Sequence, residues 1–147
     1  GSAGGSGGSA GGSGGSAGGS GGTFWNHPYD PSGSPAPVSG NHNSGMGCVG
    51  CHAATTSPPP QFAFGGTVFK PGGGAASHVE IGVLSNGVLY SAYSATNGNF
   101  WVVGSTDIDW ATAEVRMRDS NGETSMQSQA SSNCNSCHVS GAALIAP

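Results

Sequence analysis

The sequence predicts a mostly β protein built around a small β-sandwich. Three observations between residue 62 and about residue 126 indicate this: short apolar runs, turn signals between the runs, and almost no helical periodicity. Short runs bounded by Gly, Pro and Asn are typical of all-β domains. The predicted strands are residues 62–69, 78–84, 88–94, 99–103 and 113–118.

Turn signals separate these strands. Asn-Gly pairs stand at 86–87, 97–98 and 121–122, and Pro-Gly-Gly-Gly occupies 71–74. Asn-Gly favours tight hairpins because both residues tolerate positive φ. Residues alternate in character along the strand predicted at 78–84, so one set is expected to face the core and the other to face outward. The inward set is Val79, Ile81 and Val83, and the outward set is His78, Glu80 and Gly82.

Four segments are expected along the chain of 147 residues. Residues 1–22 contain only Gly, Ser and Ala and repeat one seven-residue unit three times from Ser2 to Gly22. This arm is expected to be a flexible tether, or to be ordered by neighbouring chains, because ordering costs about 1–2 kcal/mol per residue. The other three segments are an irregular segment at 23–61, the sandwich at 62–128 and a C-terminal segment at 129–147.

Charged side chains are scarce, at 7% of residues, and the formal net charge is −4. Five Phe, three Trp and three Tyr indicate a chain that packs. Three basic residues exclude the electrostatic footprint of a nucleic-acid or anionic-lipid partner. No apolar run approaches the roughly 18–20 residues that span a bilayer, so no membrane span is expected. Because the chain begins with Gly, we expect an exported product whose signal peptide has been removed.

Two Cys-x-x-Cys-His motifs use all four cysteines of the chain. This spacing is typical of c-type haem attachment, in which two thiols bond the haem edges and the next histidine ligates iron. The motifs predict two covalently attached haem c groups. The attachment residues are Cys48 and Cys51 with His52 as iron ligand, and Cys134 and Cys137 with His138 as iron ligand.

Zinc binding and disulfide bonds are the alternatives for paired cysteines. A zinc site does not require a histidine directly after each pair, and four thiolates alone would fill the zinc tetrahedron. The sequence therefore favours haem and leaves both alternatives open.

Each iron needs a sixth ligand. His42 lies six residues before Cys48, in a run without bulky side chains, and is the best candidate. His78, on the outward face of its strand, could meet a haem laid on the sheet, and His27 could reach an iron of another subunit. Methionine ligation would raise the reduction potential. The methionines are Met46, Met117 and Met126, of which the last two fit strand packing equally well.

Two resemblances extend this interpretation. The runs Phe-Gly-Gly-Thr-Val-Phe at 64–69 and Ser-Ala-Thr-Asn-Gly-Asn-Phe at 94–100 resemble the carboxypeptidase regulatory-like domain, which implies an immunoglobulin-like β-sandwich. One motif before the sandwich and one after it resemble dihaem and multihaem cytochromes of bacteria that move electrons across or beyond the outer membrane. That likeness implies an extracellular location, or else the periplasm or the cell surface, with irregular haem-binding segments flanking the sandwich.

Electron transfer is expected rather than enzymatic catalysis, because two six-coordinate haems leave no open site for a substrate. Asp107, Asp109 and Glu114 show no catalytic spacing. The first hypothesis is a homopolymer that conducts electrons outside the cell, favoured by the arm, the low charge and the surplus histidines. Its partners would be its own copies and other redox proteins or extracellular acceptors. The second hypothesis is a monomeric electron carrier, periplasmic or tethered to the surface. The third is a structural surface protein.

Overall fold

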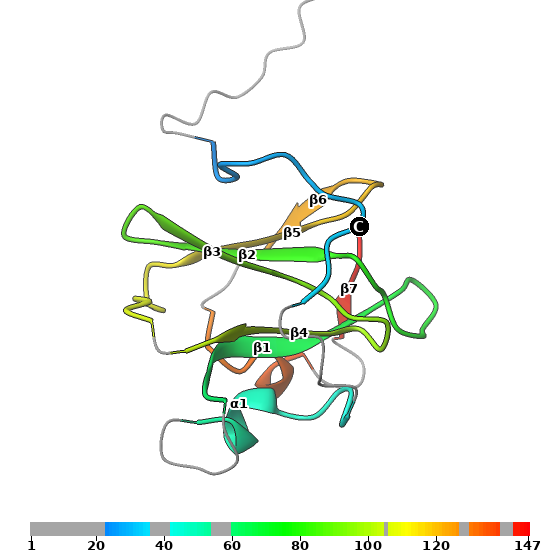
Figure 1. The fold of residues 1–147 in the computed structure, drawn as a ribbon, viewed down its shortest axis with the longest axis horizontal. Helices are drawn as coiled ribbons and strands as arrows, with labels where there is room; N and C mark the ends of the chain where they lie inside the picture. Colours follow the sequence, from blue (N-terminus) through cyan, green and yellow to red (C-terminus); the bar gives the residue numbers. More distant parts are fainter. Residues whose placement is uncertain (1–22, 36–41, 54–59, 105, 127–129, 139–142) are drawn as a thin grey trace, which may run out of the picture.

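The computed structural model describes residues 23–35, 42–53, 60–104, 106–126, 130–138 and 143–147. The fold is mostly β, with two sheets packed face to face, so the predicted fold class is confirmed (Figure 1). The Gly/Ser/Ala arm lies outside the described residues, and its role stays a prediction. Within the described part of the chain, no helix has the length and apolar character needed to cross a bilayer.

The three-stranded sheet has the order β4-β1-β7. Its central strand β1 (Phe62–Phe69) pairs with β4 (Asn99–Val103) in antiparallel register and with β7 (Leu144–Ile145) in parallel register. The bounds of β1 and β4 are the predicted ones. The sequence did not predict β7, through which the C-terminal segment joins the sandwich.

The four-stranded sheet has the order β3-β2-β5-β6, and all its neighbours are antiparallel. Its strands are β2 (Glu80–Ser85), β3 (Val88–Tyr93), β5 (Glu114–Arg118) and β6 (Glu123–Ser125). The first three lie within two residues of the predicted bounds, and β6 was not predicted. Asn86 adopts a φ of 51° and Gly87 one of 78°, which confirms the predicted hairpin between β2 and β3.

The core lies between the two sheets. Phe64 and Phe100 of the three-stranded sheet are fully buried and belong to one cluster with Val79, Ile81 and Val83, so the predicted inward set is confirmed. Each fully buried side chain of this kind contributes about 1.5–3 kcal/mol through the hydrophobic effect.

The outer face of the four-stranded sheet is covered by residues 23–35. Glu80 and Gly82 were expected to face outward, and both are buried because this segment crosses over them. A Cβ atom added to Gly82 would lie 2.7 Å from the Trp25 ring and 2.8 Å from the Phe24 ring. The aromatic rings of Phe24 and Trp25 in the irregular segment therefore pack on the protein's own sheet.

Candidate functional site

Each Cys-x-x-Cys-His motif forms one short helical turn. The first is α1 (Cys48–Cys51) and the second is η1 (Cys134–Ser136), a 3-10 turn. The amide of His52 donates to the Cys48 carbonyl oxygen at 3.0 Å. In the second motif, the amide of His138 donates to the Cys134 carbonyl oxygen at 3.0 Å. Residues three and four apart share one helix face. The turn therefore brings two thiols and one imidazole to the same side, as haem attachment requires.

Both motifs lie against β1, with α1 and η1 beside each other in Figure 1. A Cβ atom on Gly65 would lie 3.3 Å from the Cβ of Cys48, and one on Gly66 would lie 2.8 Å from the Cβ of Cys134. Neighbouring residues of a strand point to opposite faces. The first cysteines of the two motifs therefore contact the two faces of one strand at consecutive glycines.

Asn135, the first variable residue of the second motif, ties the two motifs together. Its buried side chain donates to the Met46 carbonyl oxygen at 2.7 Å, in the loop that leads into α1. Its Oδ1 accepts the amide of Thr67 on β1 at 3.0 Å. Thr67 Oγ1 in turn accepts the amide of Gly45 at 2.9 Å. This network fixes the spacing of the motifs, and no sequence signal marked Asn135 or Thr67.

We expect Asn135→Ala to lower the free energy of unfolding by about 1–3 kcal/mol, because it removes the side-chain acceptor of the Thr67 amide, and Thr67 is fully buried. Ser136→Ala, at the adjacent and exposed position, is the matched control and should cost much less. Chemical denaturation followed by circular dichroism measures both. Equal losses for the two variants would show that the network does not hold the motifs.

The first motif faces a small pocket with an aromatic wall. His52 Nδ1 lies 2.9 Å from the Pro60 carbonyl oxygen, so it is placed to donate a hydrogen bond and leave Nε2 as the metal-binding atom. The ring of His52 stacks on Phe62, with centroids 4.1 Å apart, and Phe62 stacks on Trp101. These contacts orient the imidazole.

His42 lines this pocket together with His52, and its role as a distal ligand stays a prediction. Its ring centroid lies 6.0 Å from that of His52. Two imidazoles that bind one metal ion from opposite sides have a similar separation, about 6 Å, because each metal–nitrogen bond is about 2 Å long. The Asn99 side chain donates to the His42 carbonyl oxygen at 2.8 Å and anchors this loop to β4.

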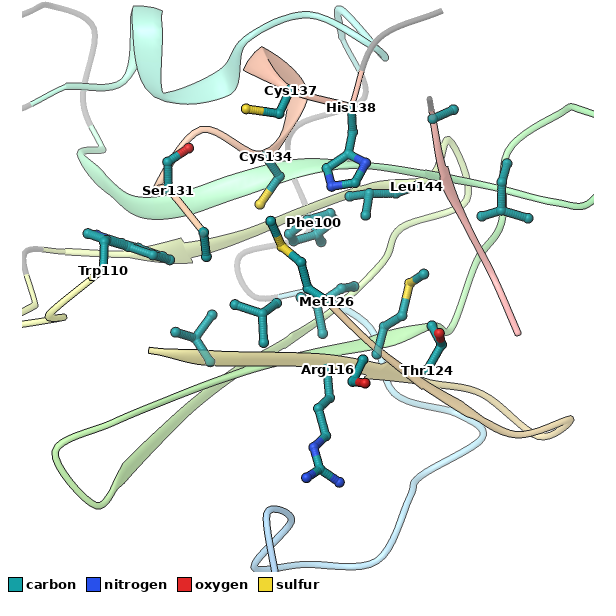
Figure 2. A pocket seen from close by; sticks show the side chains of 18 residues that line it. Phe100, Trp110, Arg116, Thr124, Met126, Ser131, Cys134, Cys137, His138 and Leu144 are labelled. Carbon is teal, nitrogen blue, oxygen red and sulfur yellow. The ribbon is translucent and has the colours of Figure 1, made fainter. Parts of the chain in front are cut away.

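The second motif opens into an apolar pocket between the two sheets (Figure 2). Cys134, Cys137 and His138 line one side, and the Nε2 atom of His138 is buried there. Among the other lining residues are Phe100, Trp110, Val115, Met117, Met126 and Leu144. Apolar walls around a buried imidazole suit a haem, whose potential depends on burial and on the axial ligands.

The two other candidate histidines lie at neither motif within one chain. His27 Nε2 is 2.6 Å from Glu80 Oε1 on the covered face of the four-stranded sheet. His78 is exposed, as predicted, and its Nδ1 lies 2.8 Å from the Gly33 carbonyl oxygen. Ligation of an iron by either residue would have to occur between subunits and stays a prediction.

The four thiols differ in exposure. Cys51 and Cys137 are exposed, whereas Cys48 and Cys134 are partly buried. Burial raises the pKa of Cys48. Burial, together with the nearby Cys48, raises the pKa of Cys134 to about 12. Both first cysteines therefore stay protonated at neutral pH in the haem-free chain.

We expect an alkylating reagent at pH 8 to modify Cys51 and Cys137 of the haem-free chain before Cys48 and Cys134, because thiolates are the reactive form. Cys134 should become reactive only as the pH approaches its raised pKa of about 12. Peptide mass mapping over time measures this order. The control is the chain in denaturant, where all four should react alike. Uniform reactivity in buffer would contradict the packing of both motifs on β1.

Zinc binding and disulfide bonds stay open as alternatives for the paired cysteines. The four cysteines are not joined in disulfides. A zinc site needs several ligands around one point, and the described residues contain no group of three His, Cys, Asp or Glu side chains placed to hold a metal ion. Comparison with family models, with curated proteins and with solved structures gave no match.

Proposed function

We propose that this chain is a secreted dihaem c-type cytochrome that transfers electrons and polymerises into an extracellular filament. The contact of Cys48 and Cys134 with consecutive residues of β1 carries the proposal. Two haems attached there would lie close together, and electrons pass quickly only between cofactors that are close. The protein would supply attachment, iron ligands and burial, while the redox chemistry belongs to the haems.

The exposure of the second cysteine in each motif supports electron exchange with other molecules. Cys51 and Cys137 are exposed, so the haem edge attached to each of them would lie at the surface. That edge is available to a neighbouring copy in a filament, or to a redox partner if the protein acts as a monomeric periplasmic or surface-tethered carrier.

Spectroelectrochemical titration of the purified protein tests electron transfer. We expect reversible uptake of two electrons per chain, followed by the haem absorption bands. Uptake of fewer electrons, or binding of zinc in place of haem, would overturn the proposal. Analytical ultracentrifugation then distinguishes the filament from the monomeric carrier, because a filament sediments as a polymer and the carrier as a monomer.

His42→Ala is expected to convert the first haem from low-spin to high-spin, because it removes the distal imidazole next to His52. Both haems should stay covalently bound. Visible absorption spectra of dilute protein measure this change. His27→Ala and His78→Ala are the controls, since neither side chain lines the pocket of the first motif. A low-spin first haem in His42→Ala would exclude His42 as its ligand.

A further inference from the structure

The pocket between the sheets is lined by two thioether side chains in addition to the second motif. Cys134, Cys137 and His138 line one wall, and Met126 lies across from them (Figure 2). Met117, on β5 of the four-stranded sheet, also lines the pocket. Within the described part of the chain, His138 is the only histidine that lines this pocket.

The other polar side chains of the pocket do not suit haem iron. Arg116 is a cation without an acceptor atom, and Figure 2 shows its guanidinium directed away from the pocket. The hydroxyl groups of Thr124, Ser125 and Ser131 belong to the oxygen ligands that hard cations prefer. A thioether sulfur is an established partner of histidine on haem iron. Among the pocket residues outside the second motif, methionine is therefore the side chain that suits haem iron as a ligand.

The two methionines are held differently. Met117 lies within β5, pairs with Ile81 and Thr124 in register, and packs against the hydrophobic core. Met126 follows the end of β6, where its amide donates to the Val115 carbonyl oxygen at 2.9 Å. Its half-buried side chain extends across the pocket towards Cys134 and His138 (Figure 2). Met126 is thus the sulfur that the fold directs at the second motif.

We propose that Met126 is the second axial ligand of the iron bound by His138. The inference rests on the proposed function, since it requires a haem at the second motif. A methionine takes the position for which the sequence favoured a histidine. The two haems then differ, with His42 and His52 on the first iron and His138 and Met126 on the second. Methionine ligation raises the reduction potential, so the second haem is the stronger electron acceptor of the pair.

Far-red absorption and redox titration of the intact dihaem protein test this assignment. Wild-type ferric protein should show a methionine-to-iron charge-transfer band, and Met126→Leu should abolish the band and lower the potential of one haem. Leucine conserves the volume and polarity of the site, so the fold is retained. Met117→Leu is the matched control and should keep both the band and the potential.

Two outcomes would overturn the assignment: a band that is absent from the wild-type protein, or a band that persists in Met126→Leu. Mass spectrometry of the same samples separates this failure from failure of the proposed function. If two haems are attached and the band is absent, the dihaem proposal stands and Met126 is not the ligand. If no haem is attached at Cys134 and Cys137, both proposals fail together. Met126→His should give a low-spin second haem without the band.

Discussion

Replacement of Arg118 by alanine is expected to lower the free energy of unfolding by about 3–5 kcal/mol, because it removes the arginine from a buried carboxylate and leaves that carboxylate with its contacts to His27 and Tyr93. The partner is Glu80, whose side chain is fully buried and lies 2.7 Å from the Arg118 guanidinium. Arg118 also donates to the His27 carbonyl oxygen at 3.0 Å and lies over the Trp25 ring. The substitution should therefore also loosen residues 23–35 from the sheet. Chemical denaturation measures the stability loss.

Arg116→Ala is the matched control, two residues along the same strand. Arg116 pairs with Glu114 and Glu123, and all three side chains are about one-third or more exposed. Exposed pairs of this kind contribute only about 0–1 kcal/mol. The double variant Glu80→Leu/Arg118→Leu removes both buried charges and should regain most of the stability that Arg118→Ala loses. A loss for Arg118→Ala no larger than that for Arg116→Ala would contradict the role given to the buried pair.

Deletion of residues 1–22 is expected to abolish or strongly weaken assembly while both haems stay attached. A Gly/Ser/Ala segment has much backbone entropy to lose, and a groove between neighbouring subunits is the most extended surface on which it could be ordered. The structure sets the end point of the deletion, because Phe24 and Trp25 pack on the four-stranded sheet and removing them would damage the fold. Electron microscopy and sedimentation of the secreted material measure assembly.

The control for this deletion is an arm of equal length with its residue order scrambled. If assembly depends on the repeat itself, the scrambled arm should assemble poorly, and if it depends only on composition, it should assemble normally. Normal filaments from the truncated chain, or an intact chain that stays monomeric at high concentration, would favour the tethered carrier instead.

Local signals in the sequence predicted most of the strands. Alternation placed Val79, Ile81 and Val83 in the core, and Asn86-Gly87 marked a hairpin because its residues can adopt positive φ. Alternation could not show that Glu80 is buried, since it describes one strand and not the segment that covers its outer face. The strand β7 has only two residues and carries no periodicity of its own.

The site was predictable residue by residue but not as an arrangement. The motif spacing predicted the cysteines and the proximal histidines, and proximity in sequence predicted His42, which lines one pocket with His52 in the structure. The two motifs come together on β1 because Asn133, just before the second motif, pairs with Gly65 of β1. Such a contact between residues far apart in the chain has no signature in the local sequence. The same holds for Met126, which looked like a packing residue until the fold placed it in the pocket of His138.

The proposed function requires two covalently bound haems per chain, one at each motif. Intact mass spectrometry of the purified, denatured protein counts them, because thioether bonds survive denaturation. We expect the mass of the chain plus two haems for the wild type, and plus one haem for Cys134→Ala/Cys137→Ala. A haem-free mass for protein purified from a host that attaches haem c, or zinc as its only metal, would exclude a dihaem cytochrome.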